Sequence, residues 1–145
     1  MSETKNFCKN PIITSIYTAD PAPMVYGDTL YLYTTHDEDV LENDFYTMFD
    51  WYCFSTKDMV NWTNHGKVFS LDDIEWAEAR AWAPQTIERN GKFYMYCPVQ
   101  KKGGNMAIAV GVSDSPTGPF KELGYPLIDE NDWNEIYRLP ECKQI

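Results

Sequence analysis

The sequence predicts an all-β fold, and three of its features support this class. Apolar and polar residues alternate along most of the 145-residue chain, as in strands that bury one face. Turn residues separate these stretches, and one pattern of turn and strand occurs twice. Aromatic residues make up 15% of the chain, far more than a disordered acidic chain carries, so we expect a packed core.

The first strong signal is a hairpin over residues 24–35. Gly27 and Asp28 supply the turn, and the strand after it carries Tyr31-Leu32-Tyr33. The same reasoning gives strands at about 49–55 and 67–70, and a short helix at about 71–79. His65 lies between Asn64 and Gly66, so we expect it in a loop.

A second hairpin is predicted over residues 86–97. Asn90-Gly91 is the strongest short hairpin signal, and the strand Phe93-Tyr94-Met95-Tyr96 follows it. A further strand of small and branched residues is expected at about 106–113. The Lys101–Gly104 segment between them is expected to be a flexible hairpin tip.

The two hairpins belong to an internal repeat. Tyr31-Leu32-Tyr33 and Tyr94-Met95-Tyr96 lie 63 residues apart, and so do Asp20-Pro21 and Ala83-Pro84. An all-β chain with a repeat of about 60 residues and four strands per repeat is typical of β-propeller blades. Propellers usually close with at least four blades, so two repeats predict an incomplete propeller.

Charge and composition exclude several classes of function. The chain has 22 acidic and 12 basic residues, a formal net charge of −10, which disfavours nucleic-acid and anionic-membrane partners. It has neither a membrane-length apolar run nor a stretch of the signal-peptide type at its start, so we expect a cytoplasmic protein. Four widely spaced cysteines without a CxxC motif predict buried thiols and no zinc site: Cys8, Cys53, Cys97 and Cys142.

Asp20 is the first candidate for chemistry. Pro21 and Pro23 exclude a helix around it and hold its carboxylate on a stiff, extended segment. A rigidly held carboxylate suits a general base, because such a base must orient water as well as deprotonate it. An Asp-Pro turn without chemistry is the alternative.

Other candidates lie near strand ends. Trp82, at the matching place in the second repeat, either offers a flat face to a sugar ring or fills the space between the sheets. His36 and Asp37 either line a pocket or belong to a solvated acidic loop. Asp50 and Trp51 stand in an aromatic-rich stretch that is mostly core, although both could reach a binding site.

An ordered series of short motifs runs through residues 11–136: Ala19-Asp-Pro21, Gly27-Asp-Thr-Leu-Tyr-Leu-Tyr33, Thr35-His-Asp37, the segment 50–66, Ala81-Trp-Ala-Pro-Gln85, the segment 90–96 and the segment 113–120. Together they resemble glycoside hydrolase family 43, the five-bladed β-propeller β-xylosidases and α-L-arabinofuranosidases. The resemblance implies a partial propeller domain over residues 1–145, with one blade at about 17–70 and a second at about 80–128. Each blade is expected to have four antiparallel strands.

The resemblance also implies catalytic roles. Family 43 enzymes invert the anomeric centre with an Asp base in the first blade, a second Asp that orients and tunes the acid, and a Glu general acid. Asp20 matches the base. The residues expected to contact substrate are Trp82, Ala83, His36, Asp37, Trp51 and Gln85.

The sequence departs from the family pattern near its end. Tyr137 stands where the second Asp is expected, neither Glu135 nor Glu141 matches a family motif, and the later blades are not in the sequence. We therefore expect a tail from about 137 to 145 that is unlike the family, produced by a frame change or a truncation of the gene. Family members often hold a calcium ion in the central channel, with ligands largely from later blades. The sequence shows no calcium loop, so it supports no cofactor or metal here and leaves calcium as a property of the full-length family.

The expected function is a glycosidase-type protein that acts on xylan- or arabinan-derived pentosides by inverting hydrolysis. This chain is expected to be inactive or weak, because a base without its acid loses about 10²–10⁴-fold. The alternative is a non-catalytic module that binds pentose sugars or self-assembles. The expected partners are a pentose-containing oligosaccharide and either a second copy or a complementary chain with the missing blades, since an open two-blade piece exposes its flanks.

Overall fold

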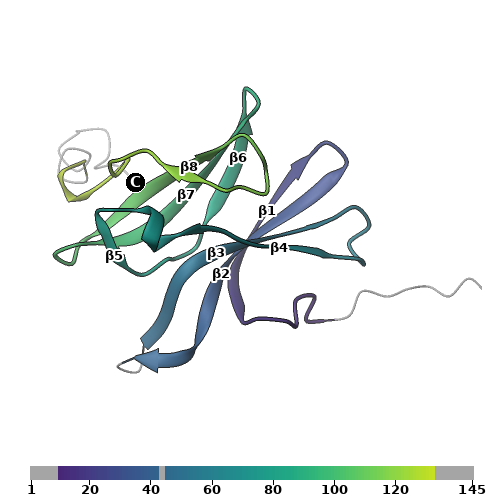
Figure 1. Cartoon of the computed structure of the whole chain (residues 1–145), viewed down its shortest axis with the longest axis horizontal. Coiled ribbons are helices and arrows are strands. Elements are labelled where there is room, and N and C mark those ends of the chain that lie inside the picture. Colours follow the sequence, from purple (N-terminus) through teal and green to yellow (C-terminus); the bar gives the residue numbers. More distant parts are fainter. Residues whose placement is uncertain (1–9, 43–44, 133–145) are drawn as a thin grey trace, which may run out of the picture.

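The structure, a computed structural model, describes residues 10–42 and 45–132 and contains two antiparallel β-sheets side by side (Figure 1). The predicted all-β class is confirmed. The expected tail from Tyr137 lies outside the described residues, as do Glu135, Glu141, Cys8 and Cys142. Among the described residues, no helix is long and apolar enough to cross a membrane.

The first sheet is a meander of four strands in sequence order: β1 (Thr18–Tyr26), β2 (Thr29–Glu42), β3 (Phe45–Thr56) and β4 (Thr63–Ser70). Gly27 closes the β1–β2 turn with a φ of 62°, a conformation that glycine adopts without steric cost. Beyond the ends of β1 and β4, β2 and β3 continue as a two-stranded ribbon, residues 37–42 and 45–49, which extends away from the sheets in Figure 1. We call this part the β2–β3 ribbon.

The second sheet contains β5 (Ala77–Ala79), β6 (Gln85–Arg89), β7 (Lys92–Lys101), β8 (Met106–Ser113) and β9 (Lys121–Glu122). β5 and β6 pair with different parts of β7, so the sheet is four strands wide. Asn90 and Gly91 both have positive φ, 55° and 75°, which fits the tight hairpin turn that the sequence predicts.

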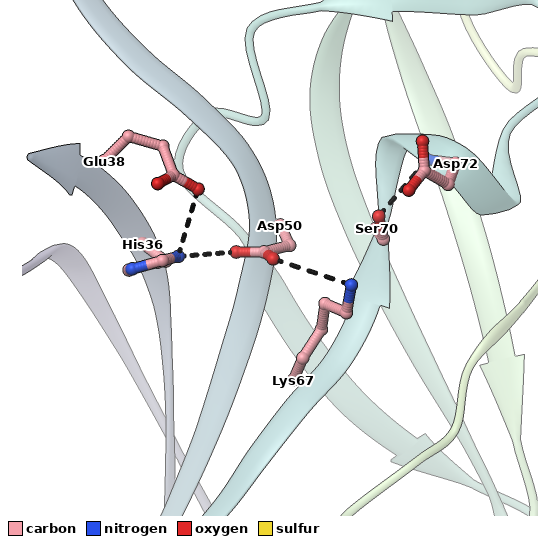
Figure 2. Close-up of polar contacts among 6 residues, drawn as sticks. All are labelled: His36, Glu38, Asp50, Lys67, Ser70 and Asp72. Atoms are coloured by element: carbon pink, nitrogen blue, oxygen red, sulfur yellow. Dashed lines mark hydrogen bonds and ion pairs between the residues drawn. The ribbon is translucent and has the colours of Figure 1, made fainter. Parts of the chain in front are cut away.

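Two local expectations are wrong. Residues 71–79 do not form an α-helix, because a 3-10 helix of three residues (Leu71–Asp73) leads directly through the buried Ile74 into the short strand β5. Ser70 caps the 3-10 helix by accepting a hydrogen bond from the Asp72 backbone nitrogen (Figure 2). His65 lies within strand β4 and not in a loop, because β4 starts at Thr63 and places the His65 Nε2 atom 2.7 Å from the Ser55 hydroxyl.

The core lies between the two sheets. Trp51 stacks on Phe69 with ring centroids 5.3 Å apart, and Phe69 in turn contacts Phe120 from the second sheet's side. The Phe120 backbone nitrogen donates a hydrogen bond to the Val68 carbonyl, 2.9 Å away. A Cβ on Gly111 of β8 would lie 2.9 Å from the Phe120 Cβ on the same sheet's side and 3.1 Å from the Phe69 ring of the first sheet, so this close packing requires glycine.

The cysteines that the structure describes are free and buried, as predicted. Cys53 lies on β3 and Cys97 on β7, and neither is exposed. Burial raises the pKa of the Cys53 thiol to about 12, which leaves it protonated and unreactive at neutral pH.

Candidate active site

An open cleft of about 440 Å³ lies where the first sheet, its ribbon and the second sheet meet. Three segments line it, and their residues are Ala19 and Asp20 of β1, Asp37, Tyr46 and Met48 of the ribbon, and Trp82 and Ala83 from the β5–β6 connection. Asp20 and Ala83 are matching positions of the sequence repeat. The repeat therefore brings corresponding residues of the two sheets to one site.

Asp20 sits at an irregularity of strand β1. The β1–β2 pairing shifts register between Ala19 and Ala22, and Asp20 has a φ of 50°, in the left-handed region that non-glycine residues rarely adopt. The fully buried Thr35 donates its hydroxyl hydrogen bond to Asp20 Oδ2 at 3.5 Å. The exposed carboxylate is thus fixed by strained backbone and one buried partner, an arrangement that recurs at functional sites.

Asp37 is the second carboxylate of the cleft. The pairing of β2 with β3 shifts register on both sides of it, and its backbone nitrogen donates to the Tyr17 carbonyl at 3.1 Å. Burial and the negative charge of Asp20 raise the pKa of the Asp37 carboxyl, and His36 opposes the shift. Its buried Oδ1 atom has no hydrogen-bond partner within the part of the chain that the structure describes. Buried polar atoms are rarely left unpaired, so this oxygen is an unusual feature of the cleft.

Trp82 forms one wall of the cleft, and its backbone is held at both polar atoms. The Trp82 nitrogen donates to the Pro98 carbonyl at 3.1 Å, and the Trp51 indole donates to the Trp82 carbonyl at 2.8 Å. The Arg80 guanidinium lies 5.2 Å from the centre of the Trp82 ring system. The half-buried indole is therefore a positioned aromatic surface of the kind that binds a sugar ring.

His36 occupies the root of the β2–β3 ribbon and does not belong to the cleft lining. Figure 2 shows its ring directed at Asp50, with 2.9 Å between His36 Nδ1 and Asp50 Oδ1. Glu38 Oε1 lies 3.8 Å from the same nitrogen, and Lys67 Nζ lies 3.8 Å from Asp50 Oδ2. The His36 ring also packs beside Tyr52, at 4.9 Å between ring centres. This network joins β2 to β3 where the ribbon leaves the sheet.

The predicted contacts with substrate separate into two groups. Asp37, Trp82 and Ala83 line the cleft together with Asp20. Trp51 does not line the cleft. Its side chain has no exposed surface and packs against Phe69, so the expectation that it contacts a sugar is wrong and Trp51 belongs to the core.

Gln85 also lies outside the cleft lining. It is exposed on β6, where its side-chain amide donates to the Thr86 carbonyl.

Two lining residues are not predicted by the sequence. Tyr46 and Met48 stand two apart in the aromatic-rich stretch whose composition indicates core, and they project to the same side of the ribbon. The sequence signal that could have found them is their spacing of two residues, which puts both side chains on one face of a strand. The distance that β3 extends beyond β4 was not visible in the sequence, and this extension is what carries them to the cleft.

The described residues do not fit a metal ion. No group of three or more His, Cys, Asp or Glu side chains within them is arranged to hold one. The cleft contributes only two carboxylates from its described lining, and a calcium ion takes six to eight oxygen ligands.

Comparisons with known proteins identify the class. The chain matches the family model of glycosyl hydrolases family 43 over residues 8–136, and it belongs to that family. It is 42% identical over 125 residues to xylosidase/arabinosidase 43A of Humicola insolens, a match that covers 81% of this chain and 38% of that protein. It is 34% identical to the xylosidase/arabinosidase of Bacteroides ovatus, over 88% of this chain and 43% of that protein.

Solved structures agree with this assignment. A GH43 β-xylosidase/α-arabinofuranosidase from a compost metagenome, in complex with xylotriose, superposes with a TM-score of 0.78 at 38% identity, over 84% of this chain and 39% of that one. The GH43_1 enzyme of Xanthomonas citri complexed with xylose gives 0.75 at 35% identity, over 80% and 34% of the two chains. The two sheets are a partial β-propeller, as predicted, and the chain spans about two-fifths of the length of the curated relatives it matches.

Proposed function

We propose that this chain carries the water-activating side of a pentosidase active site, in a protein that hydrolyses xylan- or arabinan-derived pentosides with inversion. The observation that carries the proposal is the position of Asp20, which the family pattern matches to the general base, in one cleft with Trp82. Relatives of this chain are described as complexes with xylose and xylotriose, which supports a pentose-containing oligosaccharide as the ligand.

The proposed chemistry assigns each lining group a task. Asp20 takes a proton from water while the water oxygen forms a bond to the anomeric carbon, and the glycosidic oxygen leaves with a proton from an acid on the opposite face. Thr35 holds the Asp20 carboxylate in place. Trp82 supports the apolar face of the pentose ring. Asp37 accepts a hydrogen bond from a ring hydroxyl or, when protonated, donates one to it.

As the first candidate function, the chain by itself is proposed to bind pentosides and to hydrolyse them only weakly. In the described lining of the cleft, both carboxylates come from the first sheet. An inverting enzyme needs an acid roughly 6.5–9.5 Å from the base, across the sugar ring. Loss of that proton donor costs about 10²–10⁴-fold in rate.

Pentose binding without turnover is the second candidate function. It is favoured by the character of the lining, in which the two carboxylates are outnumbered by apolar and aromatic side chains. Binding sites for neutral ligands have this composition, with a small number of polar groups that fix orientation.

Release of p-nitrophenol from p-nitrophenyl β-xyloside and α-L-arabinofuranoside tests the two candidates. Slow release by the wild-type chain that Asp20→Asn abolishes supports the hydrolase. Xylose binding without release, equal in the wild type and in Asp20→Asn, supports the binding module. A chain that neither releases nitrophenol nor binds pentoses contradicts both.

We also propose that a polypeptide with the remaining blades covers the outer face of the second sheet. Side chains on one face of β7, among them Phe93 and Met95, are buried against the first sheet. The opposite face is also apolar, since Tyr94 pairs with Val112 and Pro98 with Ile108 across β8. A sheet with one solvated face would alternate apolar and polar residues.

The length of the relatives indicates what covers this face, because the two xylosidase/arabinosidase relatives are more than twice as long as this chain. Sedimentation velocity with and without a polypeptide that carries blades three to five of a close relative tests the assembly. A one-to-one complex supports it. A compact monomer that does not bind the added polypeptide, or a homodimer that persists in its presence, contradicts the proposed assembly.

A further inference from the structure

We infer that Tyr46 is a specificity-determining residue that stacks on the sugar unit next to the reacting pentose, so that the cleft prefers oligosaccharides to single sugars. The inference rests on the proposed function, because it extends the same cleft outward. It comes from the geometry of the β2–β3 ribbon.

The ribbon orders its residues by distance from the carboxylates. Met48 pairs with Asp37 across the ribbon, so it lies at the level of the second carboxylate. Tyr46 pairs with Leu41, further along the ribbon. At about 3.3 Å per residue, Tyr46 stands about 6.6 Å beyond Met48 on the same face of β3.

The other wall is fixed to the ribbon at Met48. The Ala81 nitrogen donates a hydrogen bond to the Met48 carbonyl at 3.2 Å, and Trp82 follows Ala81 directly. Trp82 therefore lies level with the inner part of the ribbon, beside Asp37. Tyr46, which also lines the cleft, reaches past this point toward its rim.

Exposure supports the same division. The buried Met48 and half-buried Trp82 surround the floor of the cleft, whereas Tyr46 is 70% exposed. A tyrosine ring offers a rigid apolar face with a polar tip, which suits contact with a partly solvated sugar unit. A monosaccharide held on the Trp82 wall beside Asp20 would leave Tyr46 uncovered.

Phe49 provides the matched control. It is an exposed aromatic residue of the same strand, 44% exposed, and it follows Met48 directly. Successive residues of a strand project to opposite sides, and Phe49 is outside the cleft lining. Replacing Phe49 by alanine removes the same kind of side chain from the ribbon and leaves the cleft intact.

The test measures affinity for xylose and for xylotriose by calorimetry, with wild type, Tyr46→Ala, Tyr46→Phe, Phe49→Ala and Trp82→Ala. We expect Tyr46→Ala to weaken xylotriose binding about threefold to tenfold, the range of an aromatic stacking contact, and to leave xylose binding unchanged. Tyr46→Phe and Phe49→Ala should bind both sugars like the wild type. Urea unfolding of each variant establishes that it is folded.

The inference is overturned if Tyr46→Ala binds xylotriose like the wild type, if it weakens both sugars equally, or if Phe49→Ala has the same effect. In these cases, if Trp82→Ala binds neither sugar, the proposed pentose site beside Trp82 still stands and only the role of Tyr46 is rejected. A wild-type chain that binds neither sugar would overturn the inference and the proposed function together.

Discussion

The indole nitrogen of Trp51 donates a hydrogen bond of 2.8 Å to the backbone carbonyl oxygen of Trp82. Trp51 belongs to strand β3 and to the core, where it stacks on Phe69. Trp82 belongs to the β5–β6 connection and to the wall of the cleft. One side chain thus connects the packing between the sheets to the position of the candidate sugar platform.

Trp51→Phe should therefore affect stability and binding together. The substitution leaves the Trp82 carbonyl without its partner and underfills the core, so we expect the free energy of unfolding to fall by about 2–4 kcal/mol. Xylose affinity should fall as well, because the Trp82 backbone keeps only its hydrogen bond to the Pro98 carbonyl. Urea unfolding and calorimetry measure the two effects.

Phe69→Leu is the control for this prediction. It removes the stacking partner of Trp51 and leaves the hydrogen bond to Trp82 in place. We expect lower stability with unchanged xylose affinity. Wild-type affinity in a folded Trp51→Phe variant would show that the hydrogen bond does not position the cleft wall.

The fold was largely predictable because its signals are local. The turns at Gly27-Asp28 and Asn90-Gly91 and the strand at 106–113 all appear where the sequence places them. The segment 71–79 was not predictable, because its path is set by the buried Ile74 and by pairing of β5 with the distant end of β7. No local propensity encodes such a contact.

The candidate site was predictable to the extent that the repeat encodes it. The matching positions Asp20 and Ala83 meet in the cleft, although their roles in function remain predictions. Tyr46 was missed because its place depends on how far the ribbon extends. Trp51 was misplaced because an aromatic residue in a strand has the same pattern whether it faces a core or a ligand, and only the packing of Phe69 decides.

Backbone strain at Asp20 has a measurable consequence. With φ at 50°, alanine at this position pays the steric cost of the left-handed region and glycine does not. We expect Asp20→Gly to be more stable than Asp20→Ala by about 1 kcal/mol in urea unfolding. The exposed Val25 of the same strand is the control position. There, Val25→Ala should be more stable than Val25→Gly. The same order at both positions would contradict the strain.

The ionised carboxylate of Asp37 should lower the free energy of unfolding at neutral pH. Burial and the charge of Asp20 raise its pKa in the folded protein, so the folded state holds the proton more tightly than the unfolded state. The contribution of this group to stability therefore decreases as the pH rises through the range above 3.8, its ordinary value.

Asp37→Asn removes the charge, so it should stabilise the fold at neutral pH. Because the side chain is partly solvated, we expect a gain of no more than about 1 kcal/mol. The gain should vanish when urea unfolding is repeated below pH 3.8. Asp39→Asn, an exposed position of the same strand, should change little at either pH. A gain that is independent of pH would show that the charge of Asp37 is not its cause.

The His36–Asp50 pair should stabilise the root of the ribbon. The contact is 2.9 Å long, and the two side chains are only 18% and 12% exposed. We expect Asp50→Asn to cost about 1.5–3 kcal/mol, the range for a hydrogen bond to a charged group. A double-mutant cycle with His36→Gln should give a coupling free energy above about 0.5 kcal/mol.

Lys67→Met tests whether the effect belongs to this pair. Lys67 approaches Asp50 only to 3.8 Å and its side chain is 49% exposed, so its removal should cost less than about 1 kcal/mol. Equal costs for Lys67→Met and Asp50→Asn, with no coupling to His36, would show that the histidine does not join the two strands.

The central claim is that the cleft beside Asp20 and Trp82 binds a pentose. The most direct measurement is an NMR titration of the tryptophan indole signals with xylose. We predict that the Trp82 signal moves with saturation while that of Trp76, whose indole nitrogen is bonded to Glu122 away from the cleft, stays in place. Indole signals that all remain unchanged, or a Trp76 signal that moves more than that of Trp82, would contradict the claim.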